Sequence, residues 1–234
     1  MKNKKSAQIE AKKRHKDERK AAKARRRGEQ RLERAAPTRE IKPTILIVCE
    51  GENTEPSYFN QFKLTSATIK AIGNGSNTIS LVHEAADLKA KKTYEQVWCV
   101  FDKDTFPAEN FNNAIIMAEA RGMNVAYSNQ AFEYWLILHF EDHQGASMNR
   151  AEYNETINEY LQEYEVTYDG EGSKKVSEDF FEVLCGESDD GHRRIDSAIA
   201  RAKRNYNKWD HHSPALEEST TTVFKLVEEI LKYV

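Results

Sequence analysis

Apolar residues occur from residue 44 onward in short runs, separated by stretches in which apolar and polar positions alternate at helical spacing. Four of the runs have the length of a strand, and the pattern predicts strands at residues 44–49, 67–72, 96–101 and 123–128. The stretches between them predict helices at residues 54–64, 76–92 and 108–121. This alternation is typical of right-handed βαβ crossovers and a mostly parallel α/β sheet flanked by helices.

The pattern changes near residue 145. Residues 131–140 (AFEYWLILHF) are too apolar for a surface helix, so we expect them to pack deeply. More polar helices are predicted at residues 149–164, 174–185, 193–209 and 220–234. We therefore divide the chain into an N-terminal arm (1–42), an α/β core (43–145) and C-terminal helices (146–234). The last part forms either extra layers on the same sheet or a small subdomain, and the sequence leaves both open.

The charge of the chain is unevenly distributed. The net charge of the 234 residues is −3, but residues 1–42 hold 17 Lys and Arg against 6 Asp and Glu. This arm has almost no large apolar residue, so we expect it to be disordered or to form a helix only with a partner. Clustered cations neutralise nucleic-acid phosphates, and the candidates are Lys12, Lys13, Arg14, Arg25, Arg26 and Arg27. A docking arm for an acidic protein and a solvated tail remain alternatives.

Composition narrows the class of protein. No apolar run approaches the roughly 18 residues that span a bilayer, and the N-terminus has no apolar signal region. Cys49, Cys99 and Cys185 cannot all pair with one another, and buried free thiols in a reducing compartment are the simpler interpretation. We expect a cytoplasmic protein with no membrane partner.

Acidic residues follow two of the predicted buried strands. Glu50 directly follows the first strand in V-C-E-G-E-N-T-E, where Gly51 allows a sharp turn, and Asp102 and Asp104 follow the third in V-F-D-K-D. Ligands bind outside the carboxyl ends of strands in open parallel sheets. On an extended segment, alternate side chains share a face, so we expect Asp102 and Asp104 to converge.

Carboxylate oxygens suit Mg²⁺, or Mn²⁺ in its place. Two such ions can clamp the attacking and leaving oxygens during phosphodiester cleavage. Glu133, just past the fourth strand, is a further candidate ligand, or else a first-turn acid that favours its helix. Glu55, His139 and Lys103 are accessory candidates. Ordinary solvated acids at loop starts remain the alternative for all of the carboxylates.

Other sequence motifs are weaker indications of a ligand or an activity. Residues 73–78 (GNGSNT) depart from a dinucleotide fingerprint at the third glycine, so no nucleotide cofactor is expected. His139 and His143 fit no zinc-protease pattern, and His139 lies among apolar residues as a core histidine would. A basic cluster that includes Arg193 and Arg194 either contacts a nucleic-acid backbone or forms a solvated helix face. No P-loop motif is present.

Three segments together resemble a known family. I-L-I-V-C-E-G-E-N-T-E-P-S-Y-F, V-W-C-V-F-D-K-D and S-N-Q-A-F-E-Y-W-L-I-L-H-F are similar to the RloB family, small bacterial proteins related to the abortive-infection protein AbiLii. T-T-V-F-K-L-V-E-E-I near the C-terminus adds moderate similarity, and the basic arm adds none. The resemblance implies a Toprim-like fold, in which a glutamate after the first strand acts as general acid/base and a later D-x-D binds Mg²⁺. Those roles fall on Glu50, and on Asp102 and Asp104.

The resemblance further implies phage defence, with an ATPase of the ABC or OLD-like type encoded nearby. OLD-like nucleases complete a two-metal site with additional acids, and Glu133 is the candidate here. We therefore expect a Mg²⁺-dependent nuclease that acts on DNA or RNA, either alone or as a homo-oligomer. A non-catalytic binding or regulatory subunit of a defence ATPase is the alternative.

Overall fold

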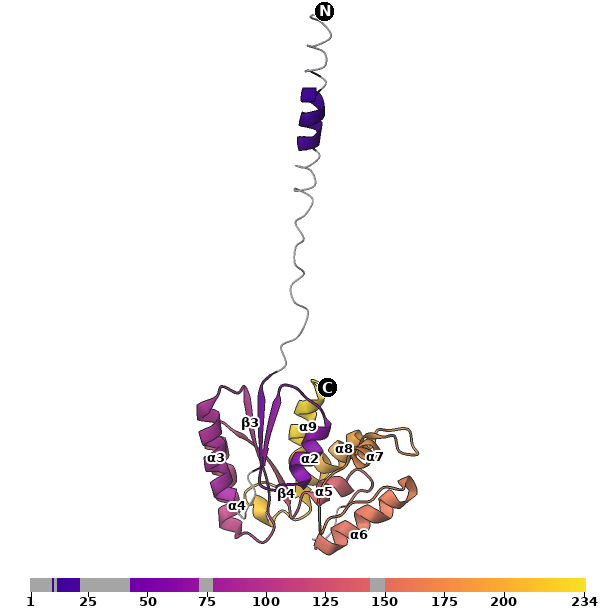
Figure 1. The fold of residues 1–234 in the computed structure, drawn as a ribbon. Helices are drawn as coiled ribbons and strands as arrows, with labels where there is room; N and C mark the ends of the chain where they lie inside the picture. The colour runs from indigo at the N-terminus through magenta and orange to yellow at the C-terminus, as the bar shows by residue number, and fades with distance from the viewer. Residues whose placement is uncertain (1–9, 11, 22–42, 72–77, 144–149) are drawn as a thin grey trace, which may run out of the picture. The chain divides into compact units, whose positions relative to one another are not determined.

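The computed structural model describes residues 10, 12–21, 43–71, 78–143 and 150–234 (Figure 1). The chain separates into two units, Met1–Ile41 and Lys42–Val234. In the first unit, residues 12–21 are helical and exposed. Lys12, Lys13 and Arg14 lie on this helix, whereas the other three predicted contacts of the arm lie outside the described residues, as do residues 73–77 of the glycine-containing loop.

The second unit is an α/β fold around a five-stranded sheet of order β2-β1-β3-β4-β5. Four strands run parallel to one another: β1 (Ile45–Cys49), β2 (Ala67–Ala71), β3 (Gln96–Asp102) and β4 (Asn124–Asn129). The short β5 (Thr220–Thr221) is antiparallel to β4. The four strands predicted from apolar runs are thus confirmed, together with their mostly parallel arrangement.

Helices cover both faces of this sheet (Figure 1). On one face lie α3 (Thr78–Lys91) and α4 (Ala108–Ala120). The opposite face is covered by α2 (Thr54–Gln61), α5 (Glu133–Ile137), α6 (Arg150–Leu161), α7 (Glu178–Cys185), α8 (Arg194–Tyr206) and α9 (Val223–Leu231). Because successive side chains of a strand point to opposite faces, Ile45 and Ile47 join the larger apolar core and Leu46 joins the smaller one.

The C-terminal helices are extra layers on the sheet. Apolar side chains of α6, α7, α8 and α9 belong to the same buried cluster as those of β1 and β3. The prediction of a helix from residue 220 is wrong at its start, because Thr220 and Thr221 pair with β4 and α9 begins at Val223. Side-chain hydrogen bonds hold this edge: the Tyr127 backbone N–H donates to Thr222 Oγ1 at 2.9 Å.

The apolar segment after β4 packs deeply, as predicted. It forms only the five-residue helix α5, followed by a turn, and Tyr134 to Leu138 are fully buried. The segment is anchored by burial on all sides, so it places the residue at its N-terminal end, Glu133, rigidly beyond the end of β4. Two 3₁₀ turns, Gln162–Tyr164 and Pro214–Leu216, connect later elements. None of the described helices has the length and apolar character needed to cross a membrane.

Candidate active site

The carboxyl ends of β1 and β3 meet at the point where the strand order reverses. From β1 the chain continues to β2 on one side and then to β3 on the other. In doubly wound sheets, the crevice at such a point is where ligands bind. Glu50 extends the pairing by one residue, because its backbone N–H donates to the Val100 carbonyl at 2.9 Å. Across the junction, the Asp102 N–H donates to Glu50 Oε2 at 3.3 Å.

A pocket of about 230 Å³ opens at this junction. It is lined by five carboxylates, those of Glu50, Glu55, Asp102, Asp104 and Glu133. The structure thus brings together the five acids named as candidates, from the strand-to-helix junctions that follow β1, β3 and β4. Sequence reasoning treated Glu55 only as an accessory candidate, yet it is buried and lines the pocket with the others.

The glycine after β1 is required for a close approach. A Cβ atom at Gly51 would lie 2.2 Å from Glu55 Oε2, well inside contact distance. Sequence analysis explained this glycine by a sharp turn, whereas the structure explains it by the space that the Glu55 carboxylate occupies. The Glu55 carboxylate therefore lies against the backbone of the loop after β1.

Asp102, the last residue of β3, is held in place by the backbone of the segment after β4. Its Oδ2 accepts a hydrogen bond from the Phe132 backbone N–H at 3.1 Å, which orients the carboxylate. Burial raises the pKa of Asp102 well above its usual value, and the neighbouring charges of Glu55, Glu133 and Glu50 raise it further. Negative charge is therefore concentrated where a cation would relieve it.

Asp104 reaches the pocket by a different route from the one predicted. Strand β3 ends at Asp102, and Asp104 has a φ of 38°, so the two side chains do not converge by strand alternation. Instead, the loop continues along β4, with the Asp104 N–H donating to the Gln130 carbonyl at 2.9 Å. Lys103 between them is not a lining residue: its Nζ donates to the Phe106 carbonyl at 2.6 Å and stabilises the loop.

Glu133 has a partner that the sequence did not reveal. The Tyr168 hydroxyl donates to Glu133 Oε1 at 2.8 Å and lies 3.3 Å from Thr54 Oγ1. Burial, followed by the charge of Glu133, raises the pKa of Tyr168, so the phenol stays protonated and remains a donor. Tyr168 therefore fixes the orientation of one carboxylate at the pocket.

The segment that follows Tyr168 brings a cation to the site. Asp169 organises it, since its Oδ1 accepts from the Gly172 N–H and its Oδ2 from the Ser173 N–H, both at 2.8 Å. Lys174 comes next, with a φ of 51°, and lines the pocket. Sequence analysis marked residues 169–173 only as a loop. An Asp followed by glycines and a serine is a signal for such a side-chain-capped turn, but nothing in it indicates where the turn leads.

Two predicted site residues belong to the core instead. The His139 ring is buried, with Nδ1 3.0 Å from the Trp135 carbonyl and its ring centroid 4.9 Å from that of Trp135. Burial lowers the pKa of His139 to about 3, so the ring is neutral. Arg194 is also buried; its guanidinium lies over the Tyr164 ring and contacts the Tyr164 hydroxyl. The burial of both side chains does not favour the accessory role of His139 or the nucleic-acid contact of Arg194, and both stay predictions.

The rest of the C-terminal basic cluster also interacts with the protein itself. Arg193 forms a two-pronged pair with Asp196 at 2.8 and 2.9 Å on the exposed surface. Arg201 donates to the Leu138 carbonyl at 2.8 Å, and Lys203 pairs with Glu228. These contacts support the solvated-face interpretation of α8 over a nucleic-acid surface.

The donor set of the pocket suits a hard divalent cation. Carboxylate oxygens are the ligands that Mg²⁺ prefers, and Mg²⁺ keeps several waters and needs only one or two protein carboxylates. Within the described ranges, no group of three or more His, Cys, Asp or Glu side chains is close enough to hold an ion directly. Asp102 and Asp104 are the residues of the pocket that would hold such an ion.

Comparison with known proteins identifies the family of the chain. No curated protein and no solved structure matched the chain. The model of the RloB-like protein family matches residues 45–230, which include all five carboxylates, Tyr168 and Lys174. On that match, which covers most of the chain, the protein belongs to the RloB-like family.

Proposed function

We propose that this protein is a Mg²⁺-dependent nuclease that hydrolyses phosphodiester bonds of DNA or RNA in bacterial phage defence. The observation that carries the proposal is the gathering of five carboxylates with Lys174 at the switch point of a parallel sheet. Membership of the RloB-like family is consistent with an association with phage defence. A defence ATPase as partner belongs to the same proposal, since the chain has no P-loop of its own.

The roles follow from position in the pocket. Asp102 and Asp104 would hold Mg²⁺, and Mn²⁺ fits the same oxygen ligands. A bound ion supplies charge stabilisation at the phosphate and a more acidic water. Glu50 adjoins Asp102 through the 3.3 Å hydrogen bond and accepts the proton of the attacking water. The water oxygen forms a bond to phosphorus as one P–O ester bond breaks, and the leaving oxygen receives the proton that Glu50 took from the water.

Lys174 and Glu133 complete this proposal. The Lys174 ammonium lines the pocket together with five acids, so it suits a non-bridging phosphate oxygen. Glu133, held by Tyr168, is oriented for a second ion or for the leaving group. We expect Lys174→Gln to lower kcat by about 100-fold, the scale of losing one electrostatic contact in the transition state.

The decisive experiment uses the full chain, plasmid DNA, single-stranded DNA and total RNA, with MgCl₂ or with EDTA. Cleavage that requires Mg²⁺ and is abolished in Asp104→Asn and Glu50→Gln supports the proposal. Asp87→Asn on the exposed surface of α3 is the matched control and should cleave normally.

Equal cleavage by Asp104→Asn and the wild-type protein would contradict the assignment. If no substrate is cleaved, with or without the neighbouring ATPase, the alternative of a non-catalytic subunit replaces the nuclease. Binding of the ATPase by the Asp104→Asn variant then measures that role directly, because it does not depend on catalysis.

A further inference from the structure

Two phenylalanines line the carboxylate pocket, and they differ in exposure. Phe132 is buried and packs edge-on against two other aromatic rings of the core. Phe106 is only half-buried and lies in the loop after β3, where the residues on either side of it are exposed. The pocket is thus lined by an aromatic residue that is accessible to solvent and follows Asp104 by two positions in the chain.

The backbone at Phe106 is held by hydrogen bonds on both sides. Its N–H donates to the Lys103 carbonyl at 3.1 Å, and its carbonyl accepts from Lys103 Nζ at 2.6 Å. Pro107 follows directly, and its carbonyl accepts from the Phe111 N–H at 3.2 Å as α4 begins. A contact surface whose backbone is already ordered loses less entropy when a ligand binds.

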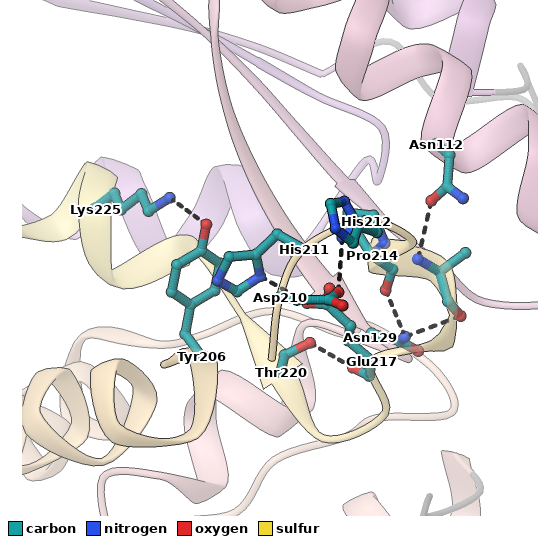
Figure 2. A network of polar contacts seen from close by, with 11 residues as sticks. Asn112, Asn129, Tyr206, Asp210, His211, His212, Pro214, Glu217, Thr220 and Lys225 are labelled. Carbon is teal, nitrogen blue, oxygen red and sulfur yellow. Dashed lines mark hydrogen bonds and ion pairs between the residues drawn. The ribbon is translucent and has the colours of Figure 1, made fainter. Parts of the chain in front are cut away.

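Other half-buried rings of the molecule already have a stacking partner. Tyr206 stacks on His211, with 3.7 Å between the ring centroids (Figure 2). Phe140 stacks on Tyr160, with 4.9 Å between the centroids. In the described part of the chain, no aromatic ring or cation packs on the ring of Phe106. The ring at the pocket is therefore available to a flat ligand in a way that these others are not.

The charge of the pocket gives such a contact its importance. Five carboxylates line the pocket together with Lys174, and their repulsion opposes the approach of a nucleic-acid backbone. The stacking of a base on an aromatic ring does not depend on charge, and one such contact strengthens binding about fivefold or more. An uncharged contact with a base can therefore hold a strand where the phosphates alone are repelled.

We propose, on the basis of the nuclease function proposed above, that Phe106 stacks on an unpaired base next to the scissile phosphate, so that the substrate is single-stranded nucleic acid. In a duplex, neighbouring base pairs cover both faces of a base, and only the base edges are open to the grooves. An unpaired base has a free face, and every base has one. This contact therefore selects single strands over duplexes and selects no particular sequence.

A pair of probes with equal charge separates stacking from electrostatic attraction. The full chain is titrated, by fluorescence anisotropy, with a labelled single-stranded thymidine oligonucleotide and with one of the same length that has no bases. CaCl₂ replaces MgCl₂, because Ca²⁺ also binds carboxylate oxygens, and a gel confirms that the strands stay intact. Residues 1–42 contain no Phe, Trp or Tyr, so the arm contributes equally to both probes. Wild type should bind the thymidine strand at least about fivefold more tightly, and Phe106→Leu should bind the two alike.

Two further variants control for folding and for the loss of any ring. Phe106→Trp keeps an aromatic face and should retain the preference for the thymidine strand, which keeps the test valid if Phe106→Leu fails to fold. Phe140→Leu makes the same change at a half-buried ring that already stacks on Tyr160, and it should behave like wild type. Equal binding of the two strands by wild type would overturn the proposal. So would a preference that survives in Phe106→Leu, or one that is lost equally in Phe140→Leu.

Cleavage assays with MgCl₂ separate this proposal from the nuclease itself. Phe106→Leu should raise KM for the thymidine strand at least about fivefold and leave kcat within about twofold, because the ring binds substrate and the carboxylates are unchanged. If Asp104→Asn abolishes cleavage but Phe106→Leu equals wild type, the nuclease assignment holds and the stacking contact is wrong. Base-dependent binding through Phe106 without cleavage by any form would keep the contact and contradict the nuclease.

Discussion

At the scale of single residues, the carboxylates of the pocket repel one another. Asp102 shows this repulsion: its pKa is raised by burial and then by the charges of Glu55, Glu133 and Glu50. Asp102→Asn keeps an oxygen to accept from the Phe132 N–H but removes the charge. We predict that this variant unfolds about 2–4 °C above the wild-type protein in EDTA, the shift for about 1 kcal/mol in a chain of this size. Thermal unfolding followed by circular dichroism measures it.

The same variant also tests whether Mg²⁺ binds in the pocket. MgCl₂ should raise the unfolding temperature of the wild-type protein, because a ligand that binds only the folded state stabilises it. The rise should be much smaller for Asp102→Asn, and Asp87→Asn should behave like wild type. A variant that is destabilised in EDTA would show that the hydrogen bonds of Asp102 outweigh the repulsion.

His139 makes a prediction about pH. Burial lowers its folded-state pKa to about 3, against an ordinary value near 6.5, so the unfolded chain binds a proton that the folded chain rejects. As pH falls from 6.5 toward 3, this histidine destabilises the fold by up to about 1.4 kcal/mol per pH unit. Above pH 6.5 the ring is neutral in both states and contributes no pH dependence.

His139→Leu should remove that contribution. Urea unfolding of wild type and variant between pH 7.5 and 4.5 gives the difference in the free energy of unfolding, which should shift in favour of the variant as pH falls. His192→Leu, at an exposed position, is the control and should show no such trend. Parallel pH curves for His139→Leu and wild type would mean that the buried ring titrates normally.

At the scale of elements, the short strand β5 depends on threonine hydroxyls. Thr222 Oγ1 accepts from the buried Tyr127 N–H, and Thr221 Oγ1 donates to the Tyr127 carbonyl at 2.9 Å. Thr222→Val keeps the shape of the side chain but leaves the Tyr127 N–H without its acceptor. We predict a loss of about 1–3 kcal/mol in the free energy of unfolding, the cost of one unsatisfied buried group.

Urea unfolding measures this loss directly. Thr93→Val makes the same chemical change at an exposed position and should alter the free energy by less than about 0.5 kcal/mol. Equal effects of the two substitutions would show that the edge of the sheet is held by apolar packing of α9 rather than by these hydroxyls.

The edge of the sheet formed by β5 was not predictable from the sequence, unlike the four parallel strands. The four parallel strands could be predicted because each is a continuous apolar run buried on both faces. Residues 220–222 could not, since three threonines carry no periodic signal and their structure comes from contacts with β4, 93–97 residues earlier. Predicted helices ended within a few residues of the observed ones, except where such long-range contacts decided the boundary.

The candidate site likewise contains residues that the sequence could predict and residues that it could not. Its acids were found because they directly follow strands whose carboxyl ends share one edge. Tyr168 lies 35 residues from Glu133 in the sequence, and no local pattern connects the two. The residue types of His139 and Arg194 suggest chemistry, but the structure buries both side chains, and a single sequence does not report burial.

At the scale of the whole molecule, the proposed nuclease activity has to be reconciled with an uneven distribution of charge. The pocket is lined by five carboxylates, and residues 43–234 carry 32 Asp and Glu against 18 Lys and Arg, so this part of the chain repels phosphates. Under the proposed function, the attraction would come from the basic arm, whose described residues include the exposed Lys12, Lys13 and Arg14. Binding and chemistry would then be carried by different parts of the chain.

The separation of binding from chemistry leads to a quantitative prediction for the arm. Replacing Lys12, Lys13 and Arg14 by Gln should weaken binding to any duplex sequence and lower the slope of log K against log salt by up to about 0.9 for each lost phosphate contact. Cleavage at saturating substrate should be unchanged, because the pocket is intact. Fluorescence anisotropy with labelled DNA between 50 and 200 mM NaCl measures the slope. The control neutralises three exposed cations of the second unit, Lys70, Lys91 and Lys92. If both triple variants lose the same slope, net charge rather than the arm attracts nucleic acid, and the arm is left to the alternative of docking on an acidic protein.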